Sequence, residues 1–415
     1  MKILLITQYF WPENFKINDL ANHIADKGHN VVVLTGIPNY PRGKYFKGYG
    51  IFNKRYEKVN NINILRSIVI PRGSGSKFIL LLNYLSFVLF ASIKIISLIK
   101  HNYDLIIVNS LSPITVALPA ILLKKINKIP ICIWVQDLWP ESVTATINLP
   151  NFINSIIQRV LNPLVKFIYK ECDKILVTSK GFISSITNKS IDSNKITYFP
   201  QWAEEIFKPI NSPRYLLNGI PKNSFKIMFA GNIGEAQDFP SILEAAKALK
   251  FNNNIQWVIL GSGRNTKWVK DKVIEYGLEN CFHLLGSYPL EKMPEYYASA
   301  DAMLLSLKDE YIFSITIPAK LQSYLACGKP ILGMIRGETA DIINKSNVGF
   351  TCLPGDSQGL AENIKKMSNL PHKHIKQLSQ NSLECYYKNF DREVLFKKAE
   401  KILTGMVNKK KFQYK

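Results

Sequence analysis

Residues Phe225–Ala246 read FKIMFAGNIGEAQDFPSILEAA, and this stretch decides the fold class. The continuous apolar run at its start predicts a strand that is buried on both faces. The strand leads through Gly231 and Gly234 into a helical pattern. Glycines at such a turn let a phosphate approach the backbone, and the helix N-terminus offers unpaired N–H groups to it. Glycines at a strand–helix turn are also common without any ligand, so a plain tight turn is the alternative.

The same rhythm of short apolar runs and helical patterns recurs along the whole chain. The predicted strands are Lys2–Thr7, Asn30–Gly36, Ile62–Ile70, Asp104–Ser110, Ile131–Asp137, Lys174–Ser179, Phe225–Gly231, Ile255–Gly263, Cys281–Tyr288, Ala302–Leu307, Pro330–Ile335 and Val348–Leu353. Such alternation predicts right-handed βαβ units and parallel sheets. Residues 207–224 are rich in Pro, Asn and Ser, which predicts a linker. We therefore expect an α/β protein with two Rossmann-like, doubly wound domains, 1–206 and 207–390, facing each other across a cleft, followed by a helix and basic tail in 391–415.

Composition narrows the class of partner without choosing one. The 415 residues carry a net charge of +22, which favours an anionic partner: nucleic acid, an anionic membrane surface or a phosphorylated substrate. The six cysteines form no Cys-x-x-Cys pair and the six histidines show no metal spacing. We therefore expect reduced thiols and no metal site. The N-terminal run lacks a small-residue cleavage site and is interpreted as a buried strand, not a signal peptide.

The apolar stretch Phe78–Ile99 is long enough to span a bilayer, but Lys94 and several polar residues interrupt it. Three interpretations stay open: a buried or cleft-lining helix, an interfacial membrane helix and a true span. Basic residues flank the stretch, namely Arg66, Arg72, Lys77 and Lys100. An anionic membrane surface is therefore a candidate partner.

The stretch Thr316–Leu332, TIPAKLQSYLACGKPIL, places a lysine at the start of a predicted helix. Pro318 suits the first turn of a helix. The helix dipole disfavours Lys320 on that turn, and a bound diphosphate would reverse this effect. A solvated lysine on an exposed turn is the alternative.

Taken together, the sequence resembles the family 4 glycosyltransferases over nearly its whole length. The order of a Gly-rich turn, a GSG loop, the aspartate of ASADAMLLSL and a helix ending in ACGKPIL carries the wider resemblance. A closer resemblance, to bacterial O-antigen and capsule transferases typified by the N-acetyl-L-fucosamine transferases, rests on Ile6–Ala21, Leu34–Tyr49, Ser112–Lys125, Trp134–Ser142 and Ile317–Leu332.

The resemblance implies the GT-B fold and retaining, metal-independent transfer without a cofactor. The C-terminal domain would bind a nucleoside diphosphate sugar, with UDP expected, and the N-terminal domain would present a saccharide linked to a lipid diphosphate. The last helix would cross back onto the N-terminal domain. We expect a cytoplasmic protein on the inner face of the bacterial plasma membrane, and no nucleic-acid partner. The alternatives are a nucleotide-sugar epimerase of the same fold and a non-catalytic basic protein that binds membrane or nucleic acid.

The resemblance also implies residues for the donor. Gly231 and Gly234 would lie against the diphosphate, and Lys320 would help to neutralise it. The further donor candidates are Asn232, Gln237, Gly261, Gly263, Arg264 and Gln322.

The chain departs from the wider family at several of these places. Asn232 and Gln237 stand where many members have Arg and Lys, and Ser323 stands where many have a second glutamate. Glu310, or its neighbour Asp309, is near the place of the first glutamate and is a catalytic candidate. Our hypothesis is that Lys320 compensates for the lost positive charge.

In the first domain the resemblance points to Asp137 as a catalytic residue. This aspartate resembles one that follows a histidine in the wider family, and Gln136 occupies the place of the histidine. Asp137 would orient or deprotonate the acceptor hydroxyl, and an ordinary helix N-cap is the alternative. The acceptor-binding candidates are Glu13, Asn14, Lys16, Tyr40, Arg42 and Glu141.

Overall fold

The computed structural model describes residues 1–73, 75–146, 151–210 and 217–413. The chain forms two compact units: unit 1 comprises Met1–Phe199 and Glu393–Lys415, and unit 2 comprises Pro200–Arg392. The predicted boundaries after residues 206 and 390 lie near these. Part of the predicted linker, 211–216, lies outside the described residues.

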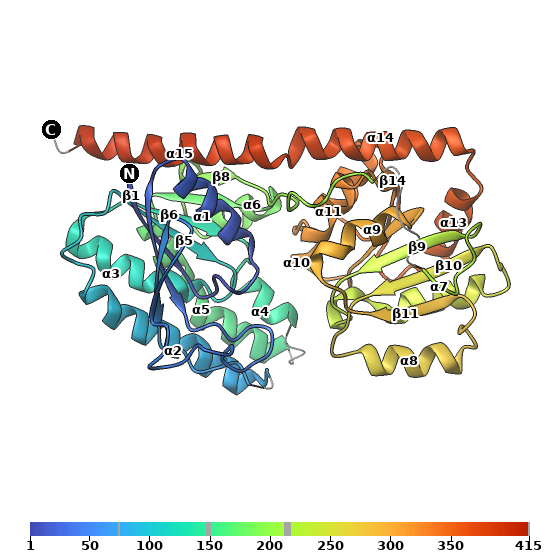
Figure 1. Cartoon of the computed structure of the whole chain (residues 1–415), viewed down its shortest axis with the longest axis horizontal. Helices are drawn as coiled ribbons and strands as arrows, with labels where there is room; N and C mark the ends of the chain where they lie inside the picture. The colour runs from blue at the N-terminus through green and yellow to red at the C-terminus, as the bar shows by residue number, and fades with distance from the viewer. Residues whose placement is uncertain (74, 147–150, 211–216, 414–415) are drawn as a thin grey trace. The chain divides into compact units, whose positions relative to one another are not determined.

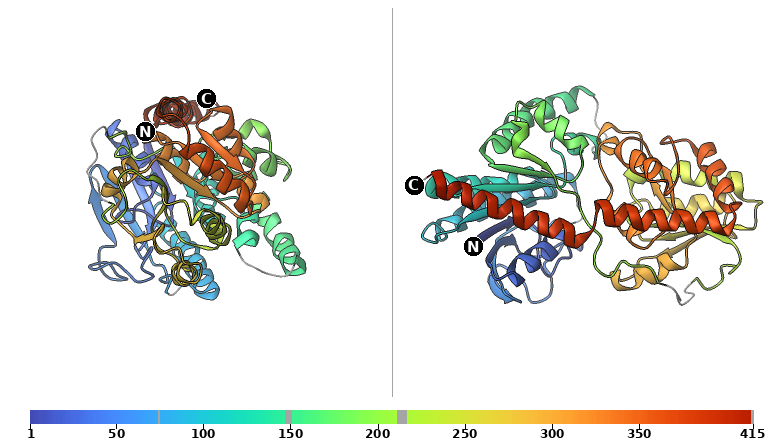
Figure 2. Two further views of the ribbon diagram at one scale, coloured as in Figure 1. Left: turned by 90° about the vertical axis from the view of Figure 1, so that its right-hand side faces the viewer. Right: turned by 90° about the horizontal axis from the view of Figure 1, so that it is seen from above.

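Unit 1 is built on an eight-stranded sheet in the order β3-β4-β2-β1-β5-β6-β7-β8. All neighbouring strands are parallel except the pair β3 and β4. The strands are β1 (Lys2–Thr7), β2 (Asn30–Gly36), β3 (Tyr56–Val59), β4 (Ile62–Ser67), β5 (Leu105–Ser110), β6 (Ile131–Val135), β7 (Lys174–Val177) and β8 (Ile196–Tyr198). The central strands are buried on both faces because helices cover them (Figures 1 and 2).

The helices of unit 1 come from both ends of the chain. They are α1 (Lys16–Asp26), α2 (Lys77–Ile96), α3 (Leu118–Asn127), α4 (Glu141–Thr146), α5 (Asn151–Glu171), α6 (Gly181–Thr187) and α15 (Arg392–Gln413), with the short 3-10 turns η1 (Ile114–Ala117) and η2 (Ser193–Lys195). The C-terminal helix α15 packs on unit 1: His23 Nε2 of α1 lies 2.6 Å from Glu400 Oε1, and the His23 ring lies 4.5 Å from that of Phe396. The side chains at the end of the predicted basic tail lie outside the described residues.

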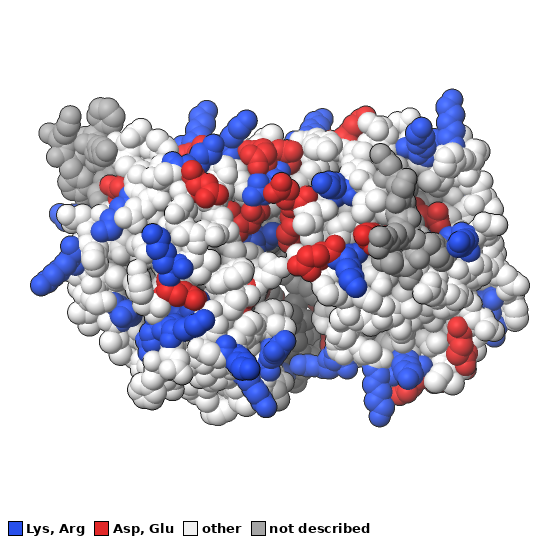
Figure 3. Space-filling view, viewed as in Figure 1, with Lys and Arg blue, Asp and Glu red and all other residues white. Residues whose placement is uncertain are grey.

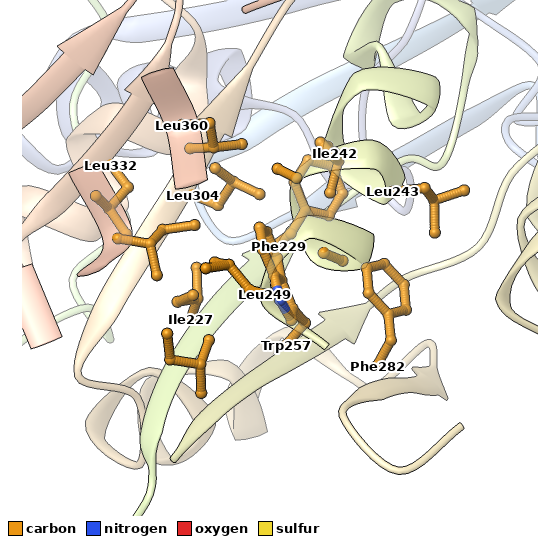
Figure 4. Close-up of a cluster of buried hydrophobic side chains, with 14 of the residues drawn as sticks. Ile227, Phe229, Ile242, Leu243, Leu249, Trp257, Phe282, Leu304, Leu332 and Leu360 are labelled. Atoms are coloured by element: carbon orange, nitrogen blue, oxygen red, sulfur yellow. The ribbon is translucent and has the colours of Figure 1, made fainter. Parts of the chain in front are cut away.

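Unit 2 has a six-stranded, all-parallel sheet in the order β11-β10-β9-β12-β13-β14. Its strands are β9 (Phe225–Ala230), β10 (Ile255–Leu260), β11 (Phe282–Gly286), β12 (Ala302–Ser306), β13 (Ile331–Met334) and β14 (Gly349–Cys352). Its helices are α7 (Phe239–Leu249), α8 (Thr266–Glu275), α9 (Met293–Ala298), α10 (Tyr311–Ser314), α11 (Ala319–Ala326), α12 (Glu338–Lys345), α13 (Ser357–Ser368) and α14 (His372–Asn389), with η3 (Glu235–Gln237) and η4 (Leu290–Lys292). Phe229, Trp257 and Phe282 pack with aliphatic side chains in its core (Figure 4).

The predicted fold class is confirmed. Each predicted strand is present, several of them shorter at the C-terminal end, and the two sheets are parallel apart from β3. Strands β3 and β8 were not predicted. The β3 sequence, YEKV, alternates in burial at the sheet edge, and β8 has only three residues. Neither therefore produces the continuous apolar run that marks a central strand.

Candidate functional site

Two glycine-containing loops lie side by side at the carboxyl ends of β9 and β10 in unit 2. The backbone N–H of Gly231 donates to Leu260 O at 2.8 Å, and that of Ile233 donates to Ser262 O at 3.0 Å. Helix α11 is attached to the end of β9, because the Tyr324 hydroxyl donates to Ala230 O at 3.2 Å and accepts from Ala230 N at 3.1 Å. This edge of a doubly wound sheet is where such folds bind ligands.

The glycines allow the two loops to touch. Gly231 has φ +142° and Gly261 has φ +132°, and residues with a side chain rarely adopt such φ angles. A Cβ on Gly261 would lie 1.8 Å from Gly231 O, and one on Gly263 would lie 2.3 Å from Ile233 O. The contact between the two loops is therefore enough to require glycine at these positions, whether or not a ligand binds there.

Lys320 points at this junction. Its Nζ lies 3.7 Å from the centroid of the Phe229 ring, and a Cβ on Gly231 would lie 2.8 Å from that Nζ. The residue as a whole is partly exposed, yet its ammonium group is poorly solvated, and this burial lowers the pKa of Lys320 to about 7. Among the described residues no carboxylate forms an ion pair with it. An anion at the loops would supply the missing counter-charge.

Gln322 was predicted to contact the donor. Its side chain is buried, and its amide donates to Pro318 O and Ala319 O, at 3.0 Å each. The amide of Gln322 therefore supports the first turn of α11.

The other donor-side candidates are spread around the loops. Asn232 and Arg264 are exposed, and Gln237 Oε1 accepts from Gly234 N at 3.2 Å. Glu310 is exposed at the start of α10, and its neighbour Asp309 pairs with Arg336. The side-chain amide of Gln237 thus stabilises the turn by accepting a hydrogen bond from its backbone.

In unit 1 three loops meet at the carboxyl ends of the adjacent strands β1, β2 and β4. The buried Glu13 joins two of them: its Oε1 accepts from Asn39 N at 2.8 Å and from Tyr40 N at 2.7 Å, and its Oε2 accepts from Phe10 N at 3.3 Å. Burial raises the pKa of Glu13 to about 7, against the lowering effect of these N–H groups. Glu13 was predicted to touch the acceptor, whereas the structure uses its carboxylate to fix the loops.

Arg72, on the third loop, was not predicted as a site residue. Its guanidinium lies 5.1 Å from the Tyr40 ring centroid and 5.7 Å from that of Tyr9, and its Nη1 donates to the Tyr9 hydroxyl at 3.0 Å. Phe15 lies 5.4 Å from both rings. The sequence offered no motif for this cluster, because its members come from three separate loops.

The remaining acceptor candidates differ in their surroundings. Asn14 and Arg42 are exposed, Lys16 is partly buried in α1, and Arg42 lies 5.9 Å from the ring of Phe46. Glu141 Oε1 accepts from Ser185 Oγ at 2.9 Å and from Lys189 Nζ at 2.6 Å. Its carboxylate thus holds α6 next to α4, and Glu141 is not free to bind an acceptor on this oxygen.

Asp137 follows β6, beside a hydrogen-bonded row of side chains at the sheet edge. Gln136 donates to Asn109 Oδ1, and Asn109 donates to Thr7 Oγ1 at 3.1 Å. Burial raises the pKa of Asp137 to about 6, and a hydrogen bond from Ser142 opposes this. A carboxylate with such a pKa suits proton transfer near neutral pH. Within the described residues, no group of three or more His, Cys, Asp or Glu side chains is arranged to hold a metal ion.

Known families match both units of the chain. Residues 17–202 match the family described as Glycosyltransferase Family 4, and residues 217–384 match Glycosyl transferases group 1. Among curated proteins, the probable glycosyltransferase WbjE of Pseudomonas aeruginosa is 27% identical over 62% of this chain and 64% of its own length. The putative colanic acid biosynthesis glycosyl transferase WcaI of Escherichia coli is 22% identical over 79% of this chain and 82% of its own length.

Solved structures share the fold at low sequence identity. Sucrose-phosphate synthase from Thermosynechococcus elongatus has a TM-score of 0.77 and 16% identity, covering 100% of both chains. Anabaena HepE, solved in complex with UDP and glucose, has a TM-score of 0.70 and 15% identity, covering 97% of this chain and 99% of its own. With both halves matching glycosyltransferase families and the whole chain matching the two-sheet fold, the protein is a glycosyltransferase of the GT-B fold.

Proposed function

We propose that this glycosyltransferase moves a sugar from a UDP-sugar to a saccharide on a lipid diphosphate carrier, in the assembly of a bacterial surface polysaccharide. Transfer retains the anomeric configuration, needs no divalent metal and takes place on the cytoplasmic face of the plasma membrane. The donor sugar we expect is N-acetyl-L-fucosamine or a related amino sugar. The names of WcaI and of the UDP-bound HepE structure support the polysaccharide and the UDP parts of the proposal.

One observation carries the donor part: the ammonium of Lys320 lies at the two glycine loops with no carboxylate partner among the described residues. When the donor C1–O bond breaks, negative charge grows on the departing diphosphate oxygen. Lys320 and the backbone N–H groups at Gly231–Gly234 would offset that charge. Because Asn232 and Gln237 are uncharged, Lys320 supplies the nearby positive charge of this loop.

Unit 1 presents the acceptor in this proposal. Asp137 orients the acceptor hydroxyl and takes its proton as the oxygen bonds to C1, which a pKa of about 6 permits at neutral pH. Arg72, held between Tyr9 and Tyr40, is a planar cation suited to a phosphate or a sugar face. Glu13 fixes the loops that carry these groups.

A donor screen tests the proposal. The purified protein is incubated with UDP-, GDP- and dTDP-sugars and a lipid-linked acceptor in membranes, and release of nucleoside diphosphate is measured. UDP release that depends on acceptor is expected. No consumption of any sugar nucleotide would refute the transferase proposal for these substrates, and an inverted anomeric coupling constant in the product NMR spectrum would exclude retention.

A further inference from the structure

Helix α2 is apolar on its outward side as well as on its inward side, where Phe87, Ala91 and Ile95 are buried. Its polar residues Asn83 and Ser86 face the protein interior and are buried. Its outward side is apolar, and the side chains there are between 51% and 68% exposed: Phe78, Leu81, Leu85, Leu89, Ile93 and Ile96. These positions recur every three or four residues, so they form one stripe along the helix. Exposing a continuous apolar stripe to water is unfavourable, so this arrangement suggests that another surface covers the stripe.

Two neighbouring helices extend the stripe into a surface. Helix α3 packs against both α2 and α5 (Figure 1). Its outward residues Leu122 and Ile126 are exposed, and so are Phe152, Ile156, Val160 and Phe167 of α5. We call the exposed apolar residues of α2, α3 and α5 the apolar face. Exposed apolar patches of this kind are typical of membrane or partner surfaces.

The charged residues of the three helices that form the apolar face are almost all basic. Helices α2 and α3 contain no Asp or Glu, and α5 has only Glu171, its last residue. The same three helices carry Lys77, Lys94, Lys124, Lys125, Arg159, Lys166 and Lys170. Figure 3 shows uncharged surface in the region of α2, with Lys and Arg side chains at its border. Apolar side chains bordered by cations complement an anionic bilayer, whose surface is negative and whose interior is apolar.

The inner side of α2 explains why it does not leave the fold to cross the bilayer. By length and composition α2 is apolar enough to span a membrane. However, Asn83 Oδ1 accepts from Gln8 Nε2 at 2.7 Å, and Ser86 Oγ accepts from Ile70 N at 2.9 Å. A spanning helix would expose Asn83 and Ser86 to lipid and lose these bonds, which is costly in hydrocarbon.

We propose that the apolar face is the membrane-docking surface, with α2, α3 and α5 seated in the interface of an anionic bilayer and α2 lying in it without spanning. This inference deepens the proposed function, and it rests on the proposal that the acceptor is linked to a lipid in the membrane. The loop that carries Arg72 leads directly into α2, and Asn83 also donates to Ile70 O. Docking therefore brings the acceptor loops of unit 1 close to the lipid surface that holds the carrier.

Vesicle flotation tests the surface directly. Full-length protein is mixed with vesicles of phosphatidylcholine alone or with phosphatidylglycerol added. We expect binding that needs phosphatidylglycerol, that falls about fivefold or more in Leu85→Ser, and that falls about fivefold in Lys94→Gln. Ile274→Ser on α8 is the matched control, because Leu85 and Ile274 are 54% and 57% exposed, and it should bind as the wild type does.

Three outcomes would overturn the proposal. The first is equal binding of wild type and Leu85→Ser; the second is resistance of the bound protein to alkaline carbonate, which marks a spanning helix. The third is a dimer in light scattering that Leu85→Ser dissociates, with no vesicle binding. Measuring UDP release with a water-soluble acceptor separates a failure of the docking surface from a failure of the proposed function. A protein that binds vesicles but releases no UDP would refute the proposed function alone. A protein that releases UDP but does not bind vesicles would refute the docking surface alone.

Discussion

Replacing Lys320 by methionine should stabilise the protein and abolish donor binding at the same time. Methionine keeps the length of the side chain and its contact with the Phe229 ring, but it removes the poorly solvated ammonium group. If Lys320 were retained only for packing, the substitution would leave donor binding unchanged, because methionine keeps those contacts. The substitution therefore separates a binding role from a structural one.

The magnitude follows from the pKa of Lys320. Burial lowers it from 10.5 to about 7, and each pKa unit corresponds to ~1.4 kcal/mol, so the buried charge costs at most about 5 kcal/mol. Lys320 is partly exposed and gains some attraction from the Phe229 ring, so we expect about 2 kcal/mol of net stabilisation in the variant. For a domain of the size of unit 2 this is a rise in Tm of roughly 5 °C.

The sign of the pH dependence is part of the prediction. The unfolded state binds the Lys320 proton below pH 10.5 and the folded state only below about pH 7. Between these values the unfolded state holds more protons, so the Lys320 contribution becomes less unfavourable as the pH rises. The gap in Tm between Lys320→Met and wild type should be full at pH 6.5 and smaller at pH 9.5.

Thermal unfolding and calorimetric titration with UDP measure both effects. Lys267→Met is the matched control, because Lys267 is also the second residue of its helix, α8, and is exposed. It should change neither Tm nor UDP affinity. A Lys320→Met protein that is less stable than wild type, or that binds UDP normally, would refute the reasoning.

Three further predictions concern the loops of the two units. Gly261→Ala should cost at least about 3 kcal/mol in urea unfolding, because its Cβ meets Gly231 O, whereas Gly277→Ala, with open space around it, should cost about 1 kcal/mol; equal costs would contradict the loop packing. Glu13→Gln should gain stability relative to wild type, by up to about 3 kcal/mol, as the pH rises from 4.5 to 7, because the wild-type carboxyl then ionises in the unfolded state while burial keeps it protonated in the folded state; parallel pH profiles would contradict this. Arg72→Gln should raise the acceptor KM about tenfold and leave donor hydrolysis unchanged, while the exposed Lys47→Gln should alter neither, and an unchanged acceptor KM would remove Arg72 from the site.

The fold was predictable from sequence because its central strands are buried on both faces. Strands such as β1 and β9 are continuous apolar runs, and their ends are marked by polar or glycine residues. Helix α2 could not be placed in the same way. It is apolar on nearly every side, so periodicity does not show which side faces inward. Its orientation depends on contacts distant in the sequence, among them the hydrogen bonds of Asn83 and Ser86 with other loops.

The candidate site was predictable only where a residue breaks a local rule. Lys320 was conspicuous because a cation at a helix start opposes the dipole. Glu13 and Gln322 were polar residues in suitable segments, and nothing in the sequence distinguishes a ligand contact from a buried clamp. Arg72 was missed for a related reason: its partners Tyr9 and Tyr40 come from other loops, which only the parallel order of β4, β2 and β1 brings together.

The pKa of Lys320 also sets a limit on how far the donor site can be desolvated. At pH 7 a lysine with a pKa of about 7 is charged in roughly half of the molecules. If only the charged form binds the donor, the apparent affinity is therefore weakened only about twofold. A further fall of one unit would leave about a tenth of the molecules charged and cost about tenfold in affinity. Asn232 and Gln237 bring no charge, and Lys308, which contacts the same turn, is paired with Glu235. Burial of Lys320 thus has two opposing effects on the donor site: it strengthens the attraction of the ammonium for a diphosphate, and it lowers the fraction of molecules in which that ammonium is charged before the donor arrives.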